Sequence, residues 1–228
     1  MGKDSSEILV RAALLDHLKS REQSDCVFLT ELTVAGFARR ADLVLANGHL
    51  AVFEIKSAAD KLSRLEGQLA CYERNFEATT VVCANKHLDG VLKLVSKGTG
   101  VITIAEDGGC HEVQTARYRR IPKDSWLGYL PVVELRKLLR LQGKHAVKQA
   151  DRRELLQACK RLKVDAVREY TLAYIKLRDL RNSKLREAAE KKRSLRLSVK
   201  QPEVASVPSW LEAFSSMGPL VAIPRKVS

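Results

Sequence analysis

The sequence predicts an α/β protein, in which a mixed β-sheet flanked by helices is followed by a basic, all-helical C-terminal region. Over residues 1–124, short runs rich in Val, Leu, Ile and Phe alternate with stretches of helical hydrophobic spacing. Asn47-Gly48 separates two of these runs and is typical of a β-hairpin turn. Lys and Arg balance Asp and Glu up to Asp124, at 17 each, whereas residues 125–228 hold 23 against 10. This asymmetry favours a polyanionic partner for the second half.

The first 124 residues contain the expected elements of one compact core. Residues 5–20 begin with two serines and carry apolar side chains at helical spacing, which predicts an amphipathic helix. Apolar runs then predict strands over residues 26–34, 38–46, 50–57, 79–84 and 100–105, and an edge strand over 110–116. Helical spacing predicts a crossover helix over residues 60–76 and a short helix over 87–95. Such alternation implies a mixed sheet with helical cover.

The second half changes to helical periodicity. Leucine-rich spacing predicts helices over residues 132–142, 149–162 and 164–180. Residues 130–162 weakly resemble a SAP-type helix, extended loop and helix that binds DNA, although an ordinary basic helical bundle fits the same pattern. Residues 178–200 are almost continuously charged and include Lys191, Lys192 and Arg193. This stretch is either a solvated helix face or a set of phosphate contacts without sequence preference.

The two strands of the predicted hairpin carry, among other charged residues, Asp42, Glu54 and Lys56. Side chains alternate across a strand, so Glu54 and Lys56 share one face. Asp42 lies on the neighbouring strand. Two carboxylates and one ammonium group can therefore converge at one point of the sheet.

This trio predicts a site for Mg²⁺ or Mn²⁺, because hard divalent cations take oxygen ligands and need only one or two carboxylates beside a substrate phosphate. Asp42 and Glu54 would bind the ion, with the Ile55 carbonyl as a third ligand, and Lys56 would act on a metal-bound water or on the phosphate. In the alternative interpretation, Asp42 and Lys56 face solvent and Glu54 pairs with Lys56. The apolar neighbours of Glu54 favour the metal, since buried charges are costly unless paired or metal-bound.

The segment resembles the PD-(D/E)XK nuclease superfamily, whose core motif is an Asp on one strand followed by (D/E)-x-K on the next. Asp42 and the run Glu54-Ile55-Lys56 match this motif, although Ala41 replaces the proline. The resemblance covers residues 6–105 and implies a restriction-endonuclease-like fold that cleaves DNA. The segment is similar to small bacterial and phage members of the superfamily.

A second match lies on the predicted crossover helix. Gln68 and Tyr72 fit the Q-x-x-x-Y signature of RecB-like members, and Arg64 lies one turn earlier on the same stripe. The resemblance implies that Gln68 is a catalytic residue and that Arg40, Arg64, Gln68 and Tyr72 contact nucleic acid. Tyr72 also fits a core position.

Two further acidic residues are candidates for this cluster. Glu31, on the first predicted strand, either joins the metal ligands or lies at the surface. Glu7 either holds a second metal ion, as the resemblance allows, or stabilises the N-terminus of the first helix. We favour Glu31 over Glu7 as a ligand.

Several classes of protein are disfavoured. The five cysteines and five histidines are scattered and form no C-x-x-C pair, which argues against a disulfide framework, a zinc site or an iron–sulfur cluster. No apolar window approaches the length of a membrane span, and the first residues do not resemble a signal peptide. We therefore expect a cytoplasmic protein that does not bind membranes. The sequence leaves the oligomeric state open.

These observations predict three parts: a nuclease domain over residues 1–124, a basic DNA-binding region over 125–200, and a proline-containing tail over 201–228 that folds back or docks on a protein partner. The favoured function is metal-dependent cleavage of DNA in repair, recombination, or phage and mobile-element biology. The first alternative is a non-catalytic DNA-binding protein that keeps the nuclease fold. The second is RNA cleavage, disfavoured because the sequence shows no aromatic platform for stacking bases.

Overall fold

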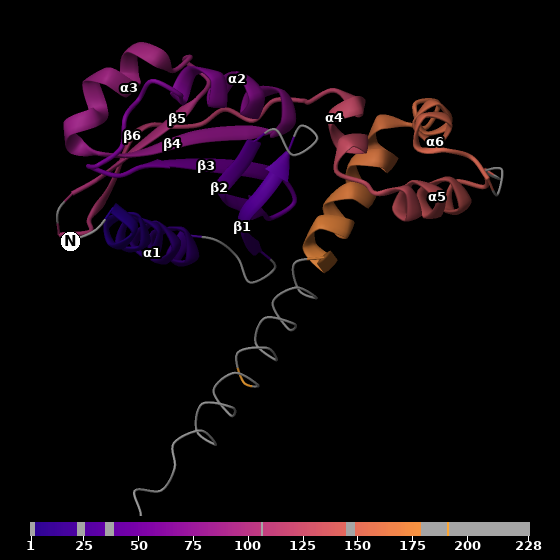
Figure 1. Ribbon diagram of the computed structural model, residues 1–228, viewed down its shortest axis with the longest axis horizontal. Coiled ribbons are helices and arrows are strands. Elements are labelled where there is room, and N and C mark those ends of the chain that lie inside the picture. Colours follow the sequence, from indigo (N-terminus) through magenta and orange to yellow (C-terminus); the bar gives the residue numbers. More distant parts are fainter. Residues whose placement is uncertain are drawn as a thin grey trace, which may run out of the picture. The chain divides into compact units, whose positions relative to one another are not determined.

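The computed structural model describes residues 3–21, 26–34, 39–105, 107–144, 149–178 and 191, with the backbone alone at 3–7 and 31. Residues 1–181 form one compact unit and residues 182–228 a second. The first unit holds a mixed sheet flanked by helices and, after it, a region of helices only (Figure 1). The predicted α/β class, with its helical C-terminal region, is therefore confirmed. Within the described residues no helix combines the length and apolar composition needed to cross a bilayer.

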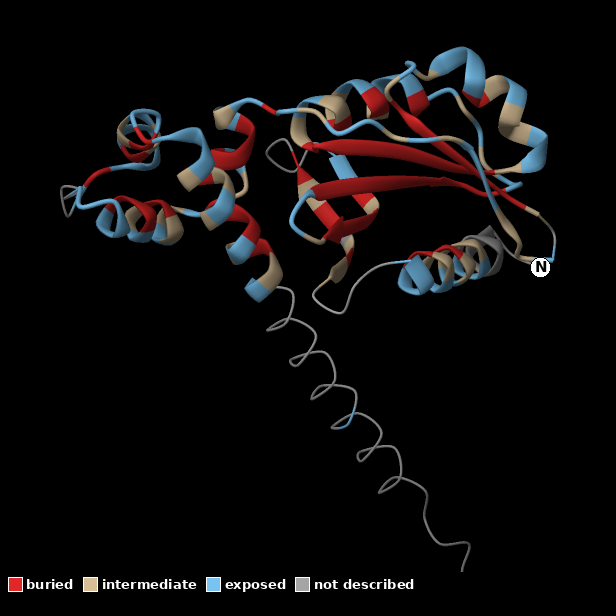
Figure 2. Cartoon of the chain, turned by 180° about the vertical axis from the view of Figure 1, so that it is seen from behind, coloured by how far each residue is buried: buried red, intermediate tan, exposed pale blue. Residues whose placement is uncertain are grey.

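The sheet has six strands whose spatial order follows their order in the sequence. The first three strands are antiparallel neighbours, β3, β4 and β5 run parallel, and β6 returns antiparallel to β5. The strands are β1 (Val27–Val34), β2 (Arg39–Ala46), β3 (Leu50–Lys56), β4 (Ala78–Ala84), β5 (Gly100–Ile104) and β6 (Cys110–Gln114). Every residue of the central strand β3 is buried (Figure 2).

Helices cover both faces of the sheet (Figure 1). On one face, α1 (Lys3–Arg21) packs Leu14 and Leu18 against apolar side chains of β2, β3, β4 and β5. On the other face, α2 (Leu65–Asn75) and α3 (Leu88–Leu94), which a short 3₁₀ turn (Asn85–His87) precedes, pack against β4 and β5. The predicted hairpin is present between β2 and β3, with Gly48 at φ 101°, a conformation that favours glycine.

The crossover helix begins later than the sequence pattern indicates. Its first residue is Leu65 rather than Asp60. The Asp60 carboxylate instead accepts hydrogen bonds from the backbone N–H and the hydroxyl of Ser57, at 2.9 and 2.7 Å. This local bond holds residues 57–60 in a turn, which competes with helix formation.

The C-terminal helices are α4 (Lys123–Gly128), α5 (Val132–Leu141), α6 (Arg152–Cys159) and a helix over residues 164–178. Sequence periodicity did not predict α4. The N-terminus of α6 is fixed by a capping box, in which Asp151 accepts the Glu154 N–H at 2.8 Å and Glu154 accepts the Asp151 N–H at 2.9 Å.

The helical region and the sheet share one hydrophobic core. Trp126 of α4 belongs to the same buried cluster as Tyr72 and Phe76 at the end of α2. Two hydroxyls tie the parts together, since Ser125 donates to the Arg74 carbonyl at 2.8 Å and Tyr129 donates to that of Asn75 at 2.7 Å. The domain boundary after residue 124 stays a prediction, and the proposed tail over 201–228 lies outside the described residues.

Candidate functional site

The structure brings the charged residues of the hairpin together. The register of β2 and β3 pairs Leu43 with Phe53, which places Asp42 and Glu54 beside each other on adjacent strands. The Asp42 carboxylate accepts the Ile55 N–H at 2.9 Å. Glu54 and Lys56 are 1% and 5% exposed, so both charges lie inside the protein.

Glu54 is the centre of a closed hydrogen-bonded cluster, which we call the Glu54 cluster: Glu54, Lys56, Gln68 and Tyr72. One oxygen of Glu54 accepts bonds from the Lys56 ammonium, at 2.6 Å, and from the Gln68 amide. Its other oxygen accepts from the Tyr72 hydroxyl at 2.8 Å. The Gln68 carbonyl oxygen in turn accepts from Lys56 at 3.0 Å. The structure therefore brings these four predicted site residues together inside the fold, and their catalytic or nucleic-acid-binding roles stay predictions.

The Tyr72 hydroxyl is a neutral donor throughout the physiological range. Burial, together with the adjacent Glu54 carboxylate, raises the pKa of Tyr72 well above its ordinary value. The hydroxyl also lies 3.1 Å from the Arg40 carbonyl, although its single hydrogen can serve one acceptor at a time. The ring itself is fully buried, so Tyr72 is a core residue as well as a member of the cluster.

The donor set can be compared with the needs of a divalent cation. Three donors already occupy Glu54, leaving about one of the four lone-pair positions of its carboxylate. Within the described residues, no group of three or more His, Cys, Asp or Glu side chains is arranged to hold a metal ion. A cation at the remaining position of Glu54 would be repelled by the Lys56 ammonium, which lies 2.6 Å from this carboxylate. The arrangement therefore fits a self-satisfied polar cluster better than a metal site, and the Mg²⁺ or Mn²⁺ cofactor stays a prediction.

The side chains of the remaining predicted site residues are either exposed or outside the described part of the structure. Arg40 and Arg64 are exposed, Arg40 on β2 and Arg64 just before α2. The side chains of Glu7 and Glu31 lie outside the described part of the structure. Of the predicted phosphate contacts in the second unit, Lys191 is exposed, and Lys192 and Arg193 lie outside the described residues. Their roles stay predictions.

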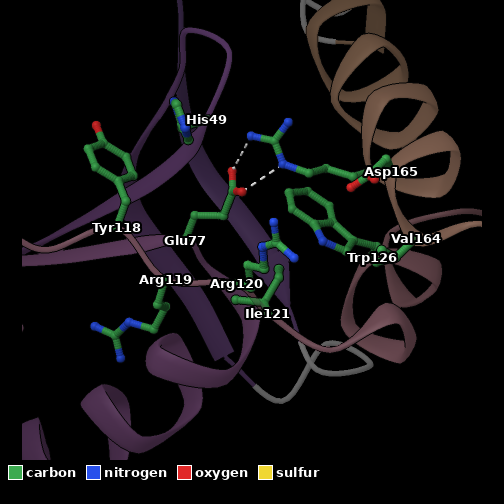
Figure 3. A pocket seen from close by; sticks show the side chains of 10 residues that line it. His49, Glu77, Tyr118, Arg119, Arg120, Ile121, Trp126, Val164 and Asp165 are labelled. Atoms are coloured by element: carbon green, nitrogen blue, oxygen red, sulfur yellow. Dashed lines mark hydrogen bonds and ion pairs between the residues drawn. The ribbon is translucent and has the colours of Figure 1, made fainter.

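Sequence reasoning missed an ion pair between the sheet and the last described helix. Arg168 donates to Glu77 through Nε and Nη2, at 2.7 and 3.1 Å. Both residues line a cavity of about 360 Å³ between the sheet and the helices, and Figure 3 shows the two bonds at its side. No local pattern could reveal this pair, because the two residues are 91 positions apart.

The helical region also carries an exposed cationic surface on α6 and the turn that follows it. We call it the α6 face: Arg153, Gln157, Lys160, Arg161 and Lys163, all of them exposed. The opposite side of this helix buries Leu155 and Cys159 in the core. Over residues 125–144 and 149–178, 12 Lys and Arg stand against 5 Asp and Glu. The charge asymmetry seen in the sequence is therefore present on a folded surface.

Comparison with known proteins identifies relatives of the chain. The model of the family described as bacteriophage P4 protein cII matches residues 1–200. Protein cII of Enterobacteria phage P4 is 37% identical over 174 residues, which is 74% of this chain and 66% of that protein. A solved protein of unknown function from Silicibacter pomeroyi aligns with 63% of this chain and 97% of its own, at 16% identity and a TM-score of 0.42.

These matches correct the interpretation drawn from the motif. The family model and the phage relative both point away from the PD-(D/E)XK superfamily, so that assignment was wrong. The predicted cleavage of DNA in repair or recombination is overturned with it, whereas the phage setting agrees with the matches. A motif of three or four residues was too short to decide the family, even though the structure places those residues side by side.

Proposed function

The chain belongs to the bacteriophage P4 protein cII family, and we propose that it is a non-catalytic DNA-binding protein that holds duplex DNA through the α6 face. The observation that carries the proposal is the row of cations on that face. Arg153 and Lys160 are two helical turns apart on one side of α6, Arg161 follows Lys160 directly, and Lys163 extends the row. Cations in such a row can contact successive phosphates of one strand.

Three of these cations are available for a ligand. Within the described residues, the side chains of Arg153, Arg161 and Lys163 form no hydrogen bond or ion pair with the protein. Lys160 makes only an exposed pair with Asp124, at 3.0 Å, which water already weakens. DNA would therefore replace water rather than protein partners at these side chains, and their binding would release counterions from the duplex.

The Lys123 side chain stabilises the turn that carries Arg161 and Lys163. The Lys123 ammonium donates to the carbonyls of Lys160 and Leu162, at 2.8 and 2.7 Å. Both carbonyls follow the last residue of α6, Cys159, where a positive charge also complements the helix dipole. The turn is thus fixed before DNA binds, so less conformational entropy is lost when the cations of the α6 face contact the phosphates.

The Glu54 cluster has a structural role in this proposal. Its charges are paired and hydrogen-bonded inside the fold, and they connect β3 to α2.

A DNA ligand also implies a protein of the cytoplasm. Phosphate contacts position a protein on DNA without reading its sequence, so we propose binding of similar strength on unrelated duplexes.

The test is duplex binding, measured by fluorescence anisotropy, of a variant in which Arg153, Arg161 and Lys163 are all replaced by Ala. We expect the slope of log affinity against log salt to fall by up to about 2.7, at roughly 0.9 for each phosphate contact. Affinity should fall equally on two duplexes of unrelated sequence.

A matched control removes the same charge elsewhere. Replacing Lys86, Lys93 and Lys97, which are exposed around α3, by Ala leaves the same net charge as the test variant. We expect this control to bind duplex DNA almost as the native chain does. Equal losses in the two variants would show that only net charge matters, and the α6 face would then have no special role.

A further inference from the structure

A second site lies in the cavity between the sheet and the helices. Its walls come from four separated parts of the chain: the β2–β3 turn, the residue before β4, the segment that leads into α4 together with α4, and the helix over residues 164–178. The volume, about 360 Å³, falls in the range of small-molecule sites in proteins. The residues that matter here are His49, Glu77, Tyr118, Arg120, Trp126 and Arg168.

One wall of the cavity is an aromatic pair. The rings of His49 and Tyr118 lie with their centroids 4.5 Å apart and are tilted by 48°. Tyr118 is 55% exposed although it is a large ring, so part of the pair is open to a ligand. An exposed aromatic face is the kind of surface on which a nucleobase stacks.

Two arginines that line the cavity, Arg168 and Arg120, differ in whether a carboxylate neutralises them. Glu77 balances Arg168, whose guanidinium also lies 5.8 Å from the ring centroid of Trp126. Arg120 is exposed, and within the described residues its side chain forms no hydrogen bond or ion pair. In Figure 3 the Arg120 guanidinium points toward Trp126, whereas Arg119 points away. Arg120 is therefore the cation available to an anionic ligand.

We propose that this cavity binds a nucleotide, with its base against Tyr118 and His49 and its phosphate on Arg120. A guanidinium matches the geometry of a phosphate, and an aromatic face accepts any base. An acidic peptide would use Arg120 but would leave the aromatic pair without a role. Two sources carry this chemistry: a free mononucleotide and an unpaired nucleotide at the end of a DNA strand.

The test uses the full chain with Trp210 replaced by Phe, so that Trp126 is the one remaining indole. Its fluorescence is followed while dTMP, thymidine or inorganic phosphate is added. We expect dTMP to bind at least about tenfold more tightly than thymidine or phosphate alone, because stacking and charge act together. Phosphate that binds as well as dTMP would remove the role of the aromatic pair and overturn the proposal.

Substitutions assign the binding to named side chains. Tyr118→Ala and Arg120→Ala should each weaken dTMP binding by about tenfold or more, whereas Tyr118→Phe, which keeps the ring, should stay within about twofold. Arg117→Ala is the control for Arg120→Ala, since Arg117 is exposed three positions away and does not line the cavity. Equal binding by the Arg117 and Arg120 variants would overturn the assignment.

A last pair of ligands separates the two sources. If unpaired nucleotides are the ligand, a duplex with a short single-stranded overhang should bind more tightly than a blunt duplex, and Tyr118→Ala should abolish that difference. If free nucleotides are the ligand, dTMP binding should saturate while the two duplexes bind equally. Failure of both measurements overturns the proposal. The triple substitution on the α6 face should leave dTMP binding unchanged, so this site and the proposed duplex site fail independently.

Discussion

Arg168 and Glu77 join the last described helix to the sheet by two hydrogen bonds, from Nε at 2.7 Å and from Nη2 at 3.1 Å. Glu77 also accepts the Leu50 N–H at 2.9 Å, and Arg168 also donates to the Gly48 carbonyl at 2.7 Å. The pair therefore fixes the β2–β3 turn, the start of β4 and the helix over residues 164–178 at one point. Removing this ion pair should therefore lower the free energy of unfolding of the whole first unit.

Arg168→Met should lower the free energy of unfolding by about 3 kcal/mol, because it leaves the Glu77 carboxylate, 5% exposed, without its counter-charge. Urea denaturation measures this change. The double variant Glu77→Gln with Arg168→Met should be more stable than Arg168→Met alone, since the unpaired charge is then gone. A double variant less stable than either single one would show that the ion pair is not the source of the effect.

Lys56 and Glu54 allow a test of the predicted cation. Lys56→Ala removes the ammonium 2.6 Å from Glu54 and leaves that buried carboxylate uncompensated. We expect the melting temperature of this variant to rise more on addition of Mn²⁺ than that of the native chain, because the ion can replace the missing charge. Glu54→Gln with Lys56→Ala should lose this gain. Equal gains in all three proteins would place the ion elsewhere.

The sequence predicted the parts of the structure that depend on neighbours along the chain. The β2–β3 hairpin follows from Asn47-Gly48, and the shared face of Gln68 and Tyr72 follows from their spacing of one helical turn. The late start of α2 was not predicted, because hydrophobic spacing does not reveal the bonds from Ser57 to Asp60. These bonds hold residues 57–60 in a turn that competes with the helix.

Contacts between distant segments were beyond local patterns. The Glu77–Arg168 pair and the cavity beside it are assembled from segments that are far apart in the sequence, so periodicity carries no signal for them. The family assignment failed for a different reason. Asp42, Glu54 and Lys56 do converge, but a convergence of this kind is also made by a buried, self-satisfied ion pair. The match of residues 1–200 to another family outweighs it.

Two buried thiols should make the protein sensitive to alkali. Burial raises the pKa of Cys83 and of Cys159 from 9.0 to about 11. Between pH 9 and 11 each thiol is ionised in the unfolded chain and protonated in the folded one, so stability falls as pH rises, by roughly 2 to 3 kcal/mol per thiol. Cys83→Ala and Cys159→Ala should each flatten this fall, measured by urea denaturation at pH 8 and 11. Parallel curves for native and variant chains would contradict the expectation.

Lys123 and Arg161 should affect DNA binding in different ways, although each contributes one positive charge near the α6 face. The Lys123 ammonium donates hydrogen bonds to the carbonyls of Lys160 and Leu162, whereas the Arg161 side chain is exposed. Arg161→Met should therefore remove a phosphate contact and lower the log–log salt slope by up to about 0.9. Lys123→Met should loosen the turn and weaken binding while leaving the slope nearly unchanged. Anisotropy titrations from low to moderate salt measure both quantities, and an equal loss of slope in the two variants would show that Lys123 itself contacts the DNA.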